Sequence, residues 1–139
     1  LLCEIARRLG ACLRAGDLMA RLGGDEFVVV VNELEDLRAL GAVADKLQQA
    51  LAQPLTLGAR ELHLSASIGV AVFPNDGESL EPLLSCADQA MYHAKRSGRA
   101  RTEYYRRELG EAIARRLLIE SALREARHGD GLDLRLQPQ

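Results

Sequence analysis

The sequence predicts an α/β or α+β fold in which helices pack on one sheet. Its 139 residues alternate between segments with helical periodicity and segments with strand periodicity, as expected when helices cover a sheet. Two short apolar runs are joined through Gly23-Gly24-Asp25-Glu26, a combination typical of a tight β-hairpin. With 47% hydrophobic and 27% charged residues, the chain has the composition of a globular domain.

The N-terminal part predicts a helix followed by the hairpin. Ile5, Leu9 and Leu13 recur at helical spacing from the start of the chain to about residue 14. The runs 18–22 and 27–31 then form two strands, because the glycines between them tolerate a positive φ at the turn. The acidic pair therefore lies at the tip of the hairpin.

The middle of the chain predicts a helix, a strand and a second helix. Residues 37–51 carry apolar side chains every three or four positions after the candidate cap Asp36, and Pro54 stops this helix. Residues 62–73 alternate as one strand, and the small side chains on one of its faces would let a helix or a ligand approach closely. The next helix runs from about Ser79 to the stop signal Gly98.

The C-terminal part predicts a last strand and a connector. Residues 102–105 form the strand, and residues 106–127 form a heavily charged helix. Leu132, Leu134 and Leu136 then alternate like a strand that enters a new unit. Because both ends look cut, we expect the chain to be a fragment of a longer protein.

Charge and composition exclude several classes of function. Eighteen basic and twenty acidic residues leave a net charge of -2, so we expect no contact with nucleic acid or membrane, and any phosphate binding needs a local site. The longest apolar run, residues 27–31, is far shorter than the ~20 residues of a membrane helix. No signal peptide is present, which predicts a cytoplasmic location. Cys3, Cys12 and Cys86 fit no disulfide or zinc pattern, and we expect reduced, buried thiols.

The hairpin tip has residues suited to metal-assisted phosphoryl transfer. Gly23 and Gly24 leave room for a nucleotide beside the backbone, and Asp25 and Glu26 offer hard oxygen ligands to Mg²⁺. The spacing of these four residues leaves open a plain Gly-Gly-Asp turn with no chemical role.

The wider pattern resembles the GGDEF family of diguanylate cyclases. Residues 21–27, Arg-Leu-Gly-Gly-Asp-Glu-Phe, resemble its signature, and residues 14–17, Arg-Ala-Gly-Asp, match its Arg-x-x-Asp pattern at the family's spacing. Residues 65–71, Ser-Ala-Ser-Ile-Gly-Val-Ala, resemble its central strand, and residues 87–99 resemble its late helix. These matches follow one another in the family's order from residue 1 to about residue 105.

The resemblance implies a nucleotide-cyclase-like fold with a ferredoxin-type βαββαβ core and a mixed, mostly antiparallel sheet flanked by helices. Residues 1–105 would be the GGDEF domain. Asp25 and Glu26 would bind the catalytic metal, Mg²⁺ or Mn²⁺, and Asp25 would help to activate a 3′-hydroxyl. The residues implied to bind GTP are Gly23, Gly24, Lys95 and Arg99. The last two would hold phosphates, although cations at a helix end also favour the helix dipole without any ligand.

Arg14 and Asp17 correspond to the site at which the family binds its product and is inhibited. Lys46 stands where a second arginine often completes that site, and a lysine cannot reproduce a bidentate grip. A surface ion pair between Arg14 and Asp17 is the alternative.

The two ends of the chain carry further expectations. Family members have, before the first helix of this chain, a strand with another metal-binding aspartate and a segment that reads guanine. Since this chain lacks both, we expect that it does not convert GTP by itself. Residues 106–139 resemble the connector and the start of an EAL domain, the cyclic di-GMP phosphodiesterase module, with Leu136-Gln137-Pro138 where that family has Tyr-Gln-Pro.

The resemblance thus implies a cyclase domain from a tandem GGDEF and EAL protein. It would condense two GTP molecules into cyclic di-GMP and two pyrophosphates, as a homodimer because each subunit holds one GTP. The alternative is a non-catalytic module that binds GTP or cyclic di-GMP and controls an attached phosphodiesterase.

Overall fold

The structure is a computed structural model that describes residues 1–33, 37–58 and 60–107. Its elements, in chain order, are α1 (Leu2–Gly10), β1 (Leu18–Gly23), β2 (Glu26–Val30), α2 (Leu37–Ala52), β3 (Leu55–Leu57), β4 (Arg60–Leu62), β5 (Ile68–Val70), α3 (Leu80–Arg96) and β6 (Thr102–Tyr104). The order α1–β1–β2–α2–β5 matches the last five elements of a βαββαβ core, with β3–β4 as an added hairpin. The predicted cap Asp36 and the connector predicted beyond residue 107 lie outside the described residues.

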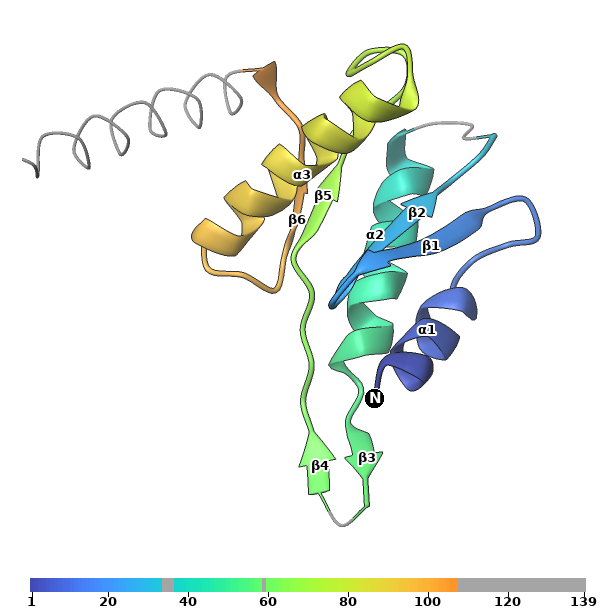
Figure 1. The fold of residues 1–139 in the computed structure, drawn as a ribbon, viewed down its shortest axis with the longest axis vertical. Coiled ribbons are helices and arrows are strands. Elements are labelled where there is room, and N and C mark those ends of the chain that lie inside the picture. The colour runs from blue at the N-terminus through green and yellow to red at the C-terminus, as the bar shows by residue number, and fades with distance from the viewer. Residues whose placement is uncertain (34–36, 59, 108–139) are drawn as a thin grey trace, which may run out of the picture.

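The described strands form three two-stranded ladders and not the single sheet that the sequence predicts. β1–β2 and β3–β4 are antiparallel, whereas β5–β6 is parallel. Figure 1 shows hairpin β1–β2 beside α2, the β5–β6 ladder beside α3, and β3–β4 at the far end of the molecule. The one strand predicted over residues 62–73 is wrong, because residues 63–67 have no ladder partner among the described residues. Side-chain alternation indicates an extended chain, but it does not predict whether a second strand lies beside that chain to form hydrogen bonds with it.

The hydrophobic core forms where α1, α2 and the hairpin meet. Leu9 of α1 packs with Leu47 and Leu51 of α2, and all three side chains are buried. Partly buried side chains from other parts of the fold pack around this cluster, and they include Met19, Phe27, Val29, Ala66 and Ile68. The hairpin is thereby held with one face against α2.

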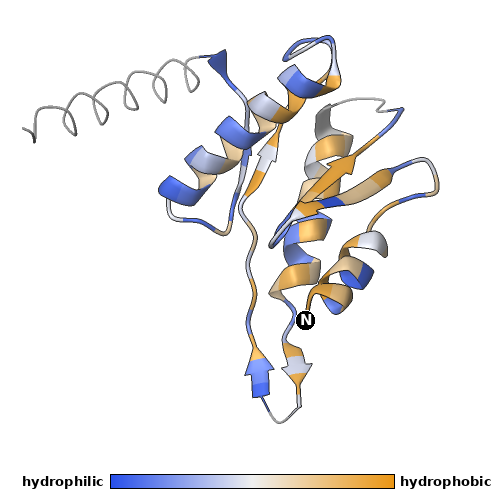
Figure 2. Cartoon of the chain, in the orientation of Figure 1, coloured by the Kyte–Doolittle hydropathy of each residue, from blue (hydrophilic) through white to orange (hydrophobic). Residues whose placement is uncertain are grey.

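Hairpin β1–β2 is apolar on both faces. Met19, Phe27 and Val29 point into the core cluster. Because side chains alternate along a strand, the other face carries the intervening residues Leu18, Ala20, Val28 and Val30, and Leu22 lies at the register shift before Gly23. Leu18 is 65% exposed and Leu22 is 61% exposed. Figure 2 shows the hydrophobic colour along both strands.

Helix α3 packs closely on β5 at Gly69. A methyl group added at Gly69 would lie 1.9 Å from the Ala87 carbonyl oxygen and 2.3 Å from the Met91 nitrogen. Ala90 and Ala94 on the same helix are fully buried. The predicted close approach to the small-residue face is therefore confirmed, and the partner is a helix.

Helix α1 ends earlier than the sequence predicts. After Gly10 the backbone hydrogen bonds shorten to three-residue steps, from Cys12 to Leu9 and from Leu13 to Gly10. The Asp17 carboxylate then accepts the Arg14 N–H, which gives the chain an alternative to a further helical turn.

The structure also bears on the state of the cysteines and on the presence of a membrane helix. All three thiols are free, but Cys3 is exposed, so the expectation that all are buried is wrong. Among the described residues, no helix combines the length and the apolar character needed to cross a membrane.

Candidate functional site

The tip of hairpin β1–β2 is a two-residue turn that presents two carboxylates. Gly23 pairs with Glu26, and the turn residues between them are Gly24 and Asp25. Gly24 has a φ of +49°, a conformation that favours glycine. The Arg21 side chain donates from Nε and Nη2 to the Gly24 carbonyl oxygen at 3.0 and 2.7 Å, and so fixes the turn.

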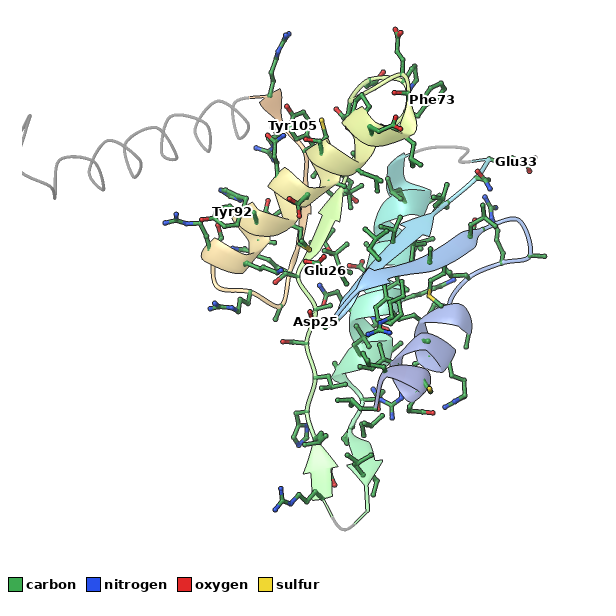
Figure 3. The ribbon with its side chains drawn as sticks, in the orientation of Figure 1. Asp25, Glu26, Glu33, Phe73, Tyr92 and Tyr105 are labelled. Carbon is green, nitrogen blue, oxygen red and sulfur yellow. The ribbon has the colours of Figure 1, made fainter. Side chains whose placement is uncertain are left out.

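Asp25 and Glu26 are both exposed at this tip. Within residues 1–33, 37–58 and 60–107, neither carboxylate forms an ion pair or a side-chain hydrogen bond. Gly23 and Gly24 have no protein atom within 4 Å of an added methyl group. The tip therefore combines free carboxylate oxygens with a backbone that is open to solvent. Figure 3 shows both acids there, at the opposite end of the hairpin from Glu33.

The donor set at the tip fits a hard divalent cation. Mg²⁺ is commonly held in proteins by one or two carboxylates together with water and substrate phosphates. Asp25 and Glu26 can supply those two carboxylates. No group of three or more His, Cys, Asp or Glu side chains in the described part of the chain gathers to hold a metal.

Lys95 and Arg99 lie at the end of α3. Lys95 is in its last turn, and Arg99 follows in the loop with a φ of +59°. Both side chains are exposed. No hydrogen bond or ion pair between described residues joins either cation to Asp25 or Glu26. The structure thus brings the two acids together, and neither cation has a side-chain hydrogen bond or ion pair with another described residue.

Arg14 and Asp17 lie at the other end of the hairpin, in the turn before β1. The Asp17 side chain is only 2% exposed, and it accepts N–H bonds from Arg14 at 3.1 Å and Asn32 at 3.3 Å. Burial alone would raise the pKa of this carboxyl, but the two N–H bonds and the Arg14 guanidinium outweigh it, so the pKa of Asp17 is lowered. Asp17 is therefore an ionised part of the turn.

The Arg14 side chain is 58% exposed and faces a pocket. Its Nη2 donates to the carbonyl oxygens of Asn32 and Glu33, the latter at 2.9 Å. The pocket has a volume of about 300 Å³, and its lining includes Arg14, Asp17, Glu33 and Lys46. Lys46, which the sequence places where a second arginine often stands, thus lines the same pocket as Arg14.

Two further residues support these sites through hydrogen bonds that the sequence does not predict. Arg21 braces the hairpin tip, and Asn32 contacts the Arg14–Asp17 turn. Arg21 stands first in the signature run 21–27, and its three-residue spacing to Gly24 across a tight turn is the signal for its bracing role. Asn32 carries no such signal, since its partners are fifteen or more positions away.

Comparison with known proteins gives one consistent family. The sequence model of the family described as "Diguanylate cyclase, GGDEF domain" matches residues 1–101. The bifunctional diguanylate cyclase/cyclic di-GMP phosphodiesterase MucR of Pseudomonas aeruginosa is 39% identical over 139 residues, which is 100% of this chain and 20% of that protein. The cyclic di-GMP phosphodiesterase NbdA of the same organism is 36% identical over 99% of this chain and 18% of its own length. The chain therefore spans about a fifth of the curated relatives it matches.

A solved structure supports the same assignment. The EAL/GGDEF domain protein from M. capsulatus is 43% identical, with a TM-score of 0.71, over 76% of this chain and 68% of that chain. This likeness confirms the nucleotide-cyclase-like fold that the sequence pattern implies.

Proposed function

The chain belongs to the GGDEF domain family of cyclic di-GMP signalling proteins, and from this premise we propose that it serves a diguanylate cyclase. The reaction would condense two GTP molecules into cyclic di-GMP. Each 3′-hydroxyl oxygen forms a bond to the α-phosphorus of the other GTP and loses its proton, while the bond from that phosphorus to the β-phosphate bridging oxygen breaks. Two pyrophosphates leave.

The observation that carries this proposal is the open hairpin tip. A methyl group added at Gly23 would meet no atom of another described residue within 4 Å, so packing within the described chain does not explain why a side chain is absent there. A nucleotide lying against the backbone would explain it. Asp25 and Glu26 beside it are free to hold Mg²⁺ or Mn²⁺, which when bound would neutralise charge on the phosphates.

The other residues take roles around this tip. Arg21 keeps the turn in shape by gripping the Gly24 carbonyl oxygen. Lys95 and Arg99 would bind phosphate oxygens, since both side chains are exposed and neither has a partner among the residues that the structure describes. Phosphoryl transfer of this kind depends mainly on positioning and charge stabilisation. Because each GTP is held by one subunit, the active form would be a homodimer.

We propose further that the intact protein joins this domain to a phosphodiesterase module. Of the two relatives named above, MucR is a bifunctional diguanylate cyclase/cyclic di-GMP phosphodiesterase and NbdA is a cyclic di-GMP phosphodiesterase. Each is far longer than this chain. Residues 106–139 would then be the connector and the start of the second module, with Gln137 an early position of it.

A second candidate function is a non-catalytic regulatory module. It is favoured by the pocket that holds Arg14, Asp17 and Lys46, and by relatives named as phosphodiesterases. Binding of GTP or cyclic di-GMP would then control the attached enzyme. Calorimetry with the Arg14→Ala variant separates the two sites, because loss of cyclic di-GMP binding would place the ligand at this pocket and not at the hairpin tip.

The test of cyclase function uses the full-length protein that contains this domain, with GTP and Mg²⁺. We expect Asp25→Asn to abolish cyclic di-GMP synthesis. We expect Gly23→Ala to reduce it by about 100-fold, because a methyl group would displace the nucleotide, while stability changes by less than about 1 kcal/mol.

Gly10→Ala is the matched control, since its methyl group would meet only the Met19 Cε, at 3.8 Å. That variant should keep full activity. Undiminished synthesis by Asp25→Asn would refute the cyclase assignment. A wild-type protein that binds GTP but makes no cyclic di-GMP would support the regulatory module.

A further inference from the structure

We propose that Asn32 is a positioning residue for ligand binding at Arg14 and Asp17. In this proposal, its side-chain amide locks the Arg14–Asp17 turn in the shape that presents the Arg14 guanidinium to the pocket. The inference rests on the proposed cyclic di-GMP site at this turn, and it adds a residue that lies outside the Arg-x-x-Asp motif of residues 14–17.

Asn32 contacts three of the four residues in the turn. Its side-chain Nδ2 donates to the Gly16 carbonyl oxygen at 2.5 Å. Its backbone N–H donates to Oδ1 of Asp17 at 3.3 Å, and its carbonyl oxygen accepts a hydrogen bond from Nη2 of Arg14. Only the first of these bonds needs an asparagine, because any residue could supply the two backbone groups.

These contacts hold both ligand-binding candidates in place. The Asp17 carboxylate is fixed by N–H groups from both sides of the turn. The Arg14 guanidinium is anchored through Nη2 by the carbonyl oxygens of Asn32 and Glu33. Its Nη1 has no hydrogen-bond partner among the described residues, and it therefore remains available to a phosphate or guanine oxygen.

The formal charges that line the pocket cancel, so an anionic nucleotide would depend on a well-positioned arginine. Arg14 and Lys46 contribute two cations, and Asp17 and Glu33 contribute two carboxylates. Asp17 accepts two backbone N–H groups and also lies 3.5 Å from Nε of Arg14, so the orientation of the Arg14 guanidinium decides how much of its positive charge is left for a ligand. If the turn changed its conformation, the Arg14 guanidinium would no longer point to the ligand.

Loss of the Asn32 side chain should therefore weaken binding without unfolding the domain. Without the bond to Gly16, only a fraction of the molecules hold the turn in its binding shape, and the apparent Kd rises by the inverse of that fraction. The loss of one neutral hydrogen bond predicts a rise in Kd of roughly 3- to 10-fold. Asn32 is exposed, so the melting temperature should change little.

The experiment is calorimetric titration of cyclic di-GMP into the full-length protein. Asn32→Ala removes the amide, and Asn32→Asp keeps its size but replaces the donor. We expect both to raise the Kd of cyclic di-GMP about 3- to 10-fold, with unchanged GTP affinity at the hairpin tip. Added salt screens the new negative charge of Asn32→Asp. A rise in Kd that comes from the lost positioning of Arg14, and not from this charge, will therefore persist in 0.5 M salt.

Asn75→Ala and Asn75→Asp are the matched controls, at an exposed loop residue outside both sites. They should bind as wild type does. If Arg14→Ala also binds as wild type does, the product site itself is wrong. If Arg14→Ala loses binding while Asn32→Ala retains it fully, the positioning role alone is overturned. A lower melting temperature with an unchanged Kd would overturn it too.

Discussion

At the scale of single residues, charge pairing on α1 makes the stability of the fold depend on pH. The Glu4 carboxylate accepts bonds from Nε and Nη2 of Arg7 at 2.8 and 2.7 Å and from Nε of Arg8 at 3.1 Å. The Arg7 bonds first, and then the Arg8 bond, lower the pKa of Glu4 to about 2. Arg8 also donates to the carbonyl oxygens of Gln53 and Pro54, which ties α1 to the end of α2.

We expect Glu4→Gln to lower the melting temperature by a few degrees at pH 7. The folded-state pKa lies below its ordinary value of 4.5, so the stabilisation is present above that pH and is lost as the pH falls toward 2. Since the side chain is 35% exposed, solvent screening keeps the effect small.

Thermal melts of both proteins across this pH range check the prediction. Glu78→Gln makes the same chemical change at an exposed carboxylate and should show no gap from wild type. If the gap for Glu4→Gln were as large at pH 2 as at pH 7, the loss would come from packing and not from charge.

The single residues differ in how far the sequence could predict them. The position of Asp25 and Glu26 at the hairpin tip could be predicted because the two are neighbours in the chain and their turn is set by local spacing, while their role in metal binding stays a prediction. Asn32 could not, because its bonds to Gly16 and Asp17 exist only once the hairpin has closed. The roles of Lys95 and Arg99 stay predictions, since no contact in the described structure joins them to the tip.

Gly69 sets the packing of whole elements, because it is where α3 meets β5. An added methyl group would overlap the backbone of α3 at Ala87 and Met91, and backbone atoms cannot move aside as a flexible side chain can. Ala90 and Ala94 are fully buried, so α3 has no space in which to move away from an added methyl group.

We therefore expect Gly69→Ala to destabilise the folded chain by about 3 kcal/mol, at the upper end of the usual effect of overpacking. Urea unfolding followed by circular dichroism measures the change. Gly10→Ala, with its one contact at 3.8 Å, should shift the unfolding free energy by less than about 1 kcal/mol. Equal stability of the two variants would show that α3 does not pack as described.

Elements with their own periodicity were predicted well, and those that depend on partners were not. The pattern of α3 from Ser79 to Gly98 agrees with the observed Leu80–Arg96, because caps and apolar spacing are local. The hairpin β3–β4 was missed, since three residues per strand give too short a pattern to detect. The single strand over 62–73 was wrong because pairing, and not alternation, decides where a ladder forms.

At the scale of the whole molecule, two packed groups share one core. α1, α2 and the hairpin surround Leu9, Leu47 and Leu51, while α3, β5 and β6 pack through Gly69. Ala66, which lies just before β5, and Ile68, which belongs to β5, pack against the cluster of the first group. In addition, Nε2 of Gln48 donates to the Ala66 carbonyl oxygen at 2.8 Å.

We expect Leu47→Ala to lower the unfolding free energy by about 2–5 kcal/mol, because it leaves a cavity where the two groups meet. Leu47 is 7% exposed, whereas Leu57 is 52% exposed, so Leu57→Ala makes the same change at the surface. The control should lose less than about 1 kcal/mol. Chemical denaturation measures both, and a similar loss in the two variants would argue against a shared core.

The two apolar faces of hairpin β1–β2 bear on how the strands find their alignment. A one-residue slip between strands exchanges the faces, and in most sheets burying the wrong face forbids it. Here either face could enter the core, so hydrophobicity carries little alignment information. That information must come from the ends, where Arg21 grips Gly24 and Asn32 grips Gly16. Arg21 and Asn32, which lie beside the two candidate sites, would then also fix the register in which β1 and β2 pair.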